Sequence, residues 1–466
     1  MKNLATASEP ILARLADWGA AVSLDDFPKA AIDRAKLIIL DTLGGAVAAI
    51  DHPAVTPVRA TLPALGEGGA ASVIGHSAQC PITSAILLNG AMVRALDFND
   101  FYWSLDGGGG HPSDNIPVAL AVGEACGASG RDVLLSVLIG YEAYCRLADL
   151  MDTGSPWDHV GVSGLAAAAM AGRLMGLDRD RLAHAMALGA TYAHPLAALR
   201  RGGISQAKAV SNAICAAQGV FGALLAAQGL TGPLTALDGP FGLPATLKPA
   251  ADLASIVPHP GDTPRISDVA IKLFPCIGTG QSAAAAALEL RQRVGDAAAL
   301  EWVEVWLPDA PVVRAQSDPG YRRPQDHETA DHSFYFIVGA ALLDGEFTPR
   351  QYANDRWADP ALVSVMDRIK VQAEDRTRGL SEFPARLVAG TRNGDRIEID
   401  MPHPPGSPTG PECGDAIQRK FRTCVEGALN DADAQALAST VLQFDTLDTL
   451  DAPLAILRRA GTDAAA

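Results

Sequence analysis

Residues able to do acid–base chemistry are concentrated in LDFNDFYWSLDGGGGHPSDN, residues 96–115. Asp97 and Asp100 lie at the end of a predicted helix, and His111 follows four consecutive glycines, Gly107 to Gly110. The helix dipole disfavours negative charge at a C-terminus, and carboxylates placed against it often mark function. Three interpretations follow: a solvated surface loop, a metal site, or the acid–base centre of an enzyme.

A metal or phosphate site is the weaker interpretation of this segment. Asp97, Asp100 and His111 could supply oxygen and nitrogen ligands, but their spacing matches no standard signature. The glycines do not match GxGxxG, and no GK[ST] follows them. We therefore predict no metal site here.

A surface loop explains only part of the segment. Asp114 precedes NIPVALAVGEA, an apolar helical pattern, and is predicted to cap that helix. Capping explains neither His111 nor the two aspartates at the end of the preceding helix. These residues keep the functional interpretation open.

Cationic residues in unusual places favour a carboxylate-binding enzyme. Lys208 falls inside a long apolar helix, and Lys272 lies in AIKLFPC. Such a lysine either reaches the surface along its stem or is held in a pocket to bind carboxylates. Arg200 and Arg201 precede Lys208, and Tyr321 opens a second basic cluster, YRR. Cations, a histidine and an aspartate together suit chemistry on a polycarboxylate.

The elements that would position these residues are mostly helices in the first 250 residues. Apolar residues at helical spacing, with glycines and prolines between many of the segments, predict this. The predicted helices span 9–22, 28–50, 81–96, 114–127, 130–153, 159–176, 180–193 and 204–230.

The pattern changes near residue 260, at the breaker-rich stretch VPHPGDTPRISD. Beyond it we predict strands at 301–308, 367–374, 385–392 and 395–402, interleaved with helices at 280–294 and 328–344. Asn393-Gly394 is predicted to form the turn of a hairpin. The fold class is therefore mainly α. Residues 1–262 and 403–466 are expected to form a helical domain, and 263–402 a smaller α/β domain.

Charge and cysteine usage limit the partners and the compartment. The net charge of −16 argues against nucleic acid and an anionic membrane surface as partners. The seven cysteines include no CxxC pair, so we expect neither a zinc ribbon nor an iron–sulfur cluster, but free thiols. The N-terminus does not resemble a signal peptide, and we expect no membrane span and a cytoplasmic location.

Several motifs in order along the chain resemble the 2-methylcitrate dehydratase family, often called MmgE/PrpD. The similarity covers essentially the whole chain. Its marks are DFND and HPSDN (97–100 and 111–115), WDHV (157–160), the helix that carries Lys208, IKLFP around Lys272, and ADHSFYF–VGAALLDG (330–345).

The resemblance implies a fold, an assembly and a set of site residues. It implies a large all-helical domain built from both chain ends, a smaller α/β lid domain whose closure completes the site, and a homodimer. It also implies catalysis without a metal or an organic cofactor. The implied active-site residues are Asp97, His111, His159, Lys208, Lys272 and Tyr321.

Three departures from the family pattern bear on the substrate. The branch that decarboxylates cis-aconitate has a threonine four residues after the aspartate, where this chain has Phe101. Dehydratases tend to have a histidine shortly after the lysine of IKxxP, whereas residues 276–281 here read CIGTGQ. The run of glycines before His111 is also unusual; it could give a mobile loop or admit a bulkier substrate.

Together these features predict a cofactor-independent hydro-lyase that dehydrates a tricarboxylic or dicarboxylic hydroxy acid, with 2-methylcitrate as the example. Asp97 and His111 are the predicted acid–base pair, and Lys208 and Lys272 the cations that stabilise enediolate-like charge. Substrate carboxylates are expected to contact His159, Tyr321, Arg200 and Arg201. The alternatives are an isomerase, epimerase or decarboxylase on cis-aconitate or iminodisuccinate, a non-catalytic helical binding protein, and a metal-dependent hydrolase.

Overall fold

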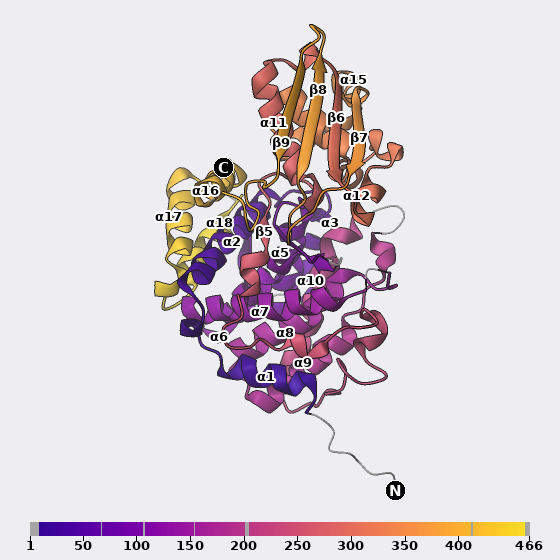
Figure 1. Ribbon diagram of the computed structural model, residues 1–466. Coiled ribbons are helices and arrows are strands. Elements are labelled where there is room, and N and C mark those ends of the chain that lie inside the picture. Colours follow the sequence, from indigo (N-terminus) through magenta and orange to yellow (C-terminus); the bar gives the residue numbers. More distant parts are fainter. Residues whose placement is uncertain are drawn as a thin grey trace. The chain divides into compact units, whose positions relative to one another are not determined.

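The chain divides into two compact units. The computed structural model describes residues 9–66, 68–105, 108–152, 154–200, 205–411 and 413–461. The helical unit comprises Met1–Ala95, Asp106–Asp268 and Gln418–Ala466. The sheet unit comprises Leu96–Leu105 and Val269–Ile417. Long helices and small sheets make the fold mainly α, as the sequence predicts (Figure 1).

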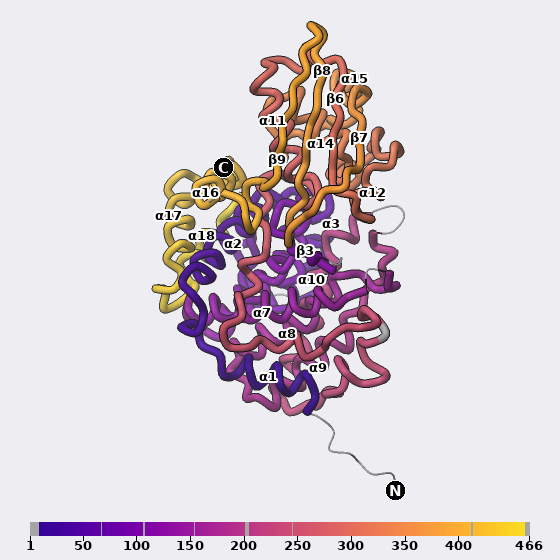
Figure 2. The backbone as a smooth tube through the Cα atoms, in the orientation of Figure 1, coloured from indigo at the N-terminus to yellow at the C-terminus, as the bar shows by residue number. Residues whose placement is uncertain are grey.

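The helical unit draws its helices from both ends of the chain. The C-terminal helix α17 packs on α2, and the yellow and indigo segments lie side by side in Figure 2. A short antiparallel pair, β1–β2, contacts α18. The helices of this unit are α1 (Ile11–Ala21), α2 (Lys29–Ala48), α3 (Thr56–Arg59), α4 (Leu62–Leu65), α5 (Ile82–Ala95), α6 (Ile116–Cys126), α7 (Gly130–Leu150), α8 (Val162–Leu174), α9 (Arg179–Tyr192), α10 (Ala207–Ala227), α17 (Asp431–Leu442) and α18 (Asp451–Arg459); its strands are β1 (Ala71–Val73), β2 (His76–Cys80) and β4 (Gly109–Gly110).

Helix α10 is long and apolar enough to cross a membrane by length and composition alone, although we expected no span from the sequence. A buried core helix passes the same test, and 61% of the apolar window is buried within the protein. Helices α5, α8 and α9 pack against α10. These contacts favour the core-helix interpretation.

The sheet unit is built on a four-stranded sheet of order β7-β6-β8-β9. Helices α11 and α14 contact each other and pack on the sheet, as Figure 2 shows. Strand β6 pairs in parallel with β7 and antiparallel with β8. The elements are β3 (Asp100–Trp103), β5 (Ala270–Ile271), α11 (Gln281–Val294), β6 (Leu300–Pro308), α12 (Pro311–Gln316), α13 (His327–Ala330), α14 (Phe334–Asp344), α15 (Pro360–Met366), β7 (Ile369–Glu374), β8 (Ala385–Thr391) and β9 (Arg396–Met401), and α16 (Gly414–Val425) begins in this unit.

The hairpin predicted at Asn393-Gly394 is confirmed: β8 and β9 pair antiparallel, and Gly394 has a φ of 90°. Of the predicted boundaries that differ from the structure, two bear on the site. Leu96–Leu105 belongs to the sheet unit because β3 pairs with β5, with Phe101 opposite Ala270. The single helix predicted at 328–344 is broken after Ala330, because Ser333 caps a new helix there.

Candidate active site

The glycines before His111 allow the backbone to approach helix α7 closely. A Cβ on Gly108 would lie 1.7 Å from the carbonyl oxygen of Ala148. Gly110 has a φ of 150°, and its Cβ would lie 2.1 Å from the Tyr144 hydroxyl oxygen. That hydroxyl accepts a hydrogen bond from the His111 backbone N–H at 3.0 Å. Close packing therefore requires glycine here, and it fixes the position of His111. Gly107 lies outside the described residues.

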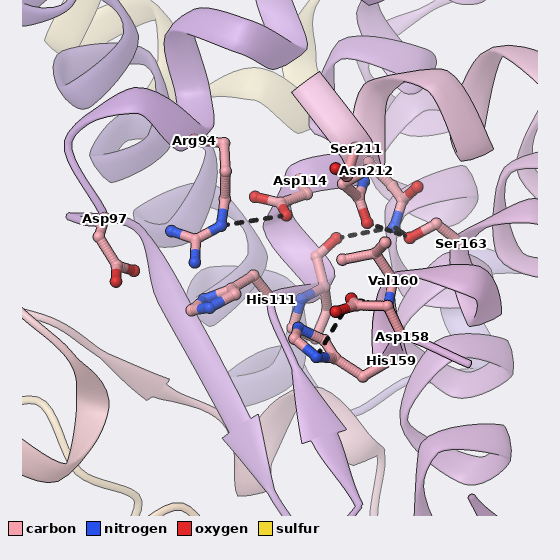
Figure 3. A network of polar contacts seen from close by, with 12 residues as sticks. Arg94, Asp97, His111, Asp114, Asp158, His159, Val160, Ser163, Ser211 and Asn212 are labelled. Carbon is pink, nitrogen blue, oxygen red and sulfur yellow. Dashed lines mark hydrogen bonds and ion pairs between the residues drawn. The ribbon is translucent and has the colours of Figure 1, made fainter. Parts of the chain in front are cut away.

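Two histidines come together in the helical unit. The rings of His111 and His159 are 6.4 Å apart between centroids (Figure 3). His159 starts a short 3₁₀ helix, His159–Gly161, which Asp158 caps by accepting from the Val160 N–H. Asp158 Oδ1 also lies 3.4 Å from His159 Nδ1. The WDHV motif thus pairs a carboxylate with an imidazole.

Arg200 contacts this pair through Asp158. Arg200 Nε donates to Asp158 Oδ2 at 3.0 Å. Burial raises the pKa of Asp158. His159, Arg200 and the Val160 N–H together lower it by more than burial raises it, so the pKa of Asp158 is below its ordinary value. Asp158 is therefore ionised at neutral pH, and its negative charge lies beside the His159 ring. Arg201, predicted with Arg200 as a substrate contact, lies outside the described residues.

Lys208 and Asp114 are both buried in the helical unit. Lys208 lies in the first turn of α10 and is 4% exposed, so it does not extend to the surface.

Asp114 was predicted to cap the next helix, and this is wrong. The N-cap of α6 is Asn115, without a side-chain cap bond, and Asp114 instead lies 3.8 Å from Arg94 Nε in a buried ion pair (Figure 3).

The sheet unit contains a second group of ionisable side chains, centred on Lys272. Lys272 is fully buried and donates to the backbone carbonyl of Asp97 at 2.9 Å and to its carboxylate. Asp97 has a φ of 47°, a left-handed conformation that costs energy for a residue other than glycine. Strained backbone held by a buried ion pair is typical of a functional site.

Asp331 and His332 join this group; they lie within the ADHSFYF motif but were not predicted as site residues. They lie between α13 and α14, and His332 Nδ1 contacts the Asp331 carboxylate. Potential ligand atoms of Asp97, Asp331 and His332 all lie within 4.8 Å of one another. The sequence signal that could have drawn attention to them is the serine that directly follows Asp331 and His332, because serine often marks the start of a helix.

By spacing alone, Asp97, Asp331 and His332 could hold a metal ion. The ammonium of Lys272 already lies on Asp97, however, and a second cation would be repelled at this distance. Lys272 therefore supplies the positive charge that a metal ion would bring, and we assign no metal to the group.

Tyr321 is linked to the same part of the sheet unit. Its carbonyl oxygen accepts from the Ser333 hydroxyl at 2.6 Å. Burial raises the pKa of Tyr321, with Asp318 and Asp331 adding to the effect, so its hydroxyl stays protonated at neutral pH. The neighbouring arginines of the YRR cluster have other contacts: Arg322 stacks over Tyr335, and Arg323 pairs with Asp367.

The departures after Lys272 and at Phe101 have a packing explanation. Phe101 is 4% exposed in the core of the sheet unit, where a Cβ on Gly278 would lie 2.8 Å from its ring. The Gln281 side chain accepts from the Leu273 and Phe274 N–H groups at 3.0 and 3.1 Å. The Gln281 side chain thus closes the loop after Lys272 through its contacts with the backbone.

The predicted site residues accordingly fall into two groups, one in each unit. The helical unit contains His111, His159, Arg200 and Lys208, and the sheet unit contains Asp97, Lys272 and Tyr321. The protein therefore belongs to a class with a mainly helical fold and a smaller α/β unit. Acid, base and cation side chains are gathered in both units. The chain belongs to the MmgE/PrpD family: residues 13–255 match the MmgE/PrpD N-terminal domain, and residues 274–446 match the MmgE/PrpD C-terminal domain.

Curated relatives carry two kinds of name. A "Cis-aconitate decarboxylase-like protein oryM" from Aspergillus oryzae is 24% identical over 96% of this chain and 97% of its own length. A "2-methylcitrate dehydratase" from Salmonella typhimurium is 26% identical over 73% of each chain. A "Cis-aconitate decarboxylase" from Aspergillus terreus is 28% identical, but the match spans only 42% of each chain. These identities support the family and leave the particular reaction to be tested.

Proposed function

We propose that the protein is a cofactor-independent hydro-lyase that dehydrates a polycarboxylic hydroxy acid of the 2-methylcitrate type. The observation that carries the proposal is the buried Lys272–Asp97 ion pair. Removing a proton next to a carboxylate puts enediolate-like charge on that carboxylate. A fixed ammonium in a buried site stabilises such charge strongly. Relatives named 2-methylcitrate dehydratase support this choice of reaction.

The residue roles follow from the contacts within each unit. Lys272 and Lys208 are proposed to stabilise charge on the substrate carboxylates. Asp97 orients the Lys272 ammonium through their ion pair. His111 is the acid–base group of the helical unit. His159 and Tyr321 orient substrate carboxylates, and Arg200 acts on His159 through Asp158.

Decarboxylation of a related acid is the second candidate. The match to the decarboxylase-like protein of Aspergillus oryzae, which covers almost the whole of both chains, favours it. Phe101 disfavours it, because its side chain is buried in the core of the sheet unit, where the decarboxylase branch would have a hydroxyl. Both reactions form a carbanion-like centre and differ in the bond that breaks next.

Incubation of metal-depleted protein with 2-methylcitrate, citrate, cis-aconitate and iminodisuccinate tests the proposal. Ultraviolet absorbance of an unsaturated acid, with its olefinic carbons seen by ¹³C NMR, is the expected result. Release of carbon dioxide would favour the decarboxylase, and inversion without loss of atoms an epimerase. Binding of any of these acids without turnover would instead support a non-catalytic helical binding protein. Loss of activity in EDTA, restored by a divalent ion, would contradict the cofactor-free mechanism.

We also propose that the protein is a cytoplasmic homodimer that binds neither nucleic acid nor membrane. Large apolar side chains of the helical unit support the dimer, since they are exposed in the part of the chain that the structure describes. Ile214 and Phe221 are seven residues apart on one face of α10, with 48% and 52% exposed. Tyr192, Leu196 and Leu230 are also exposed. The net charge supports the absence of nucleic-acid and membrane binding. The free thiols of Cys80 and Cys215 support the cytoplasmic location.

A further inference from the structure

Asp331 and His332 are fixed at the loop that follows Lys272. The backbone N–H of Ile277, in that loop, donates to the carbonyl oxygen of Asp331 at 3.1 Å. The next residue, Ser333, accepts from the Phe336 N–H and so caps α14. These contacts hold Asp331 and His332 between α13 and α14. They lie beside residues 276–281, the run without the histidine that the family's dehydratases tend to have.

The Asp331 side chain sets the orientation of the His332 ring. Asp331 is 1% exposed and lies against His332 Nδ1, whereas the His332 side chain is 16% exposed. A carboxylate accepts hydrogen bonds, so Nδ1 carries the proton of the neutral ring. The lone pair is then on Nε2, which is the arrangement of a histidine that acts as a general base.

The surrounding charges suit such a base. The Asp97 and Asp331 carboxylates would repel each other at the separation observed here. Lys272 compensates Asp97 through their ion pair, and His332 compensates Asp331 when its ring gains a proton. A proton taken by His332 therefore lowers the repulsion in the group. The Asp97 carboxylate is already engaged by the Lys272 ammonium.

We propose that His332, oriented by Asp331, is the base that removes the carbon-bound proton, in place of the histidine missing after Lys272. This inference rests on the proposed lyase function. Nε2 of His332 takes the proton alpha to the carboxylate, and the C–H electron pair forms the double bond. The C–O electron pair leaves with the hydroxyl group, which takes a proton from solvent and departs as water. The His332 ring then returns to its starting state by giving its proton to solvent.

Kinetics of His332→Asn with the acid that the wild type turns over test this inference. Asparagine keeps an N–H that can donate to Asp331 but has no atom to take the proton. We expect kcat to fall by about 10² to 10⁴-fold, with KM within about threefold. Added imidazole should partly restore His332→Ala. Asp331→Asn, a positioning variant, should lower kcat by about 10 to 10²-fold and shift the pH profile.

His327→Asn is the matched control. His327 lies five residues earlier, and its ring contacts Tyr352 edge to face with centroids 4.4 Å apart. This variant should keep wild-type kcat, and circular dichroism should show all variants folded. Near-normal kcat in folded His332→Asn, with active wild type, would overturn the inference alone. Wild-type activity that requires a divalent ion would also overturn it. A wild type inactive on all four acids would overturn the proposed function and this inference together.

Discussion

The Lys272 ammonium bonds Asp97 twice, to its backbone carbonyl at 2.9 Å and to its side-chain carboxylate. The two bonds close around a residue whose φ of 47° is unfavourable for aspartate in isolation. The ion pair therefore compensates the negative charge of Asp97 and stabilises its strained backbone conformation. Loss of either partner should affect folding and chemistry at once, because a buried charge left without its partner is costly.

Lys272→Met should lower both stability and activity. It leaves the Asp97 carboxylate buried without its ammonium, which should cost about 3–5 kcal/mol in the free energy of unfolding. Turnover should fall by about 10²-fold or more, because a fixed positive charge next to the reacting carboxylate is lost. Urea unfolding and steady-state kinetics measure the two effects. Lys370→Met, at an exposed position of β7, is the control and should change neither.

His111→Ala and Asp114→Ala should separate the chemical and structural roles of HPSDN. His111→Ala should reduce turnover by about 10² to 10⁴-fold, with little loss of stability, since the side chain is only half-buried. Asp114→Ala should instead lower the free energy of unfolding by about 3–5 kcal/mol, because Arg94 would stay buried without this carboxylate. Near-normal turnover of His111→Ala would remove that histidine from the mechanism.

The sequence predicted those parts of the fold that have a local pattern. Apolar residues at helical spacing predicted α10, and Asn393-Gly394 predicted the β8–β9 hairpin. The break between α13 and α14 was missed, because no glycine or proline separates the two helices and Ser333 marks the new start. Asp331 and His332 were missed with it.

Features of the site that depend on distant contacts could not be predicted. The pairing of β3 with β5, which brings Asp97 to Lys272, joins segments about 170 residues apart and leaves no local signal. Asp114 matched the pattern of a helix cap, but its partner Arg94 lies on the preceding helix. The need for glycine at Gly110 depends on Tyr144 from α7. In each case the physical reason for the residue required the fold.

Asp158→Asn should make the stability of the protein less dependent on pH. The folded-state pKa of Asp158 is lowered, against an unfolded value of about 3.9. Its stabilisation is therefore present above about pH 4 and is lost as the pH falls through the folded pKa. The gap in unfolding free energy between wild type and variant should narrow from about pH 7 to pH 3. Asp51→Asn, at an exposed position, should show no such gap. A gap that widens in acid would contradict the assignment.

Gly110→Ala should disturb His111 without touching its ring. The new Cβ would clash with the Tyr144 hydroxyl at 2.1 Å, and a φ of 150° is unfavourable for alanine. We expect a loss of about 2 kcal/mol or more in unfolding free energy, together with reduced turnover. Gly414→Ala is the control, since its Cβ would meet nothing within 4 Å. Equal stability of the two variants would show that the close approach is not required.

Phe221→Asp should convert the proposed homodimer to a monomer. Phe221 is 52% exposed on the same face of α10 as Ile214, so a second copy could bury both. A charge there would be desolvated in the interface but stays solvated in the monomer, so the monomer should keep its fold. Sedimentation at micromolar concentration should show the wild type near twice the 48.3 kDa chain mass and the variant at that mass. Leu65→Asp, which places the same charge at an exposed position of α4, should leave the dimer intact. A wild type that sediments as a monomer would rule out the dimer, and a dimeric Phe221→Asp would move the interface to another face.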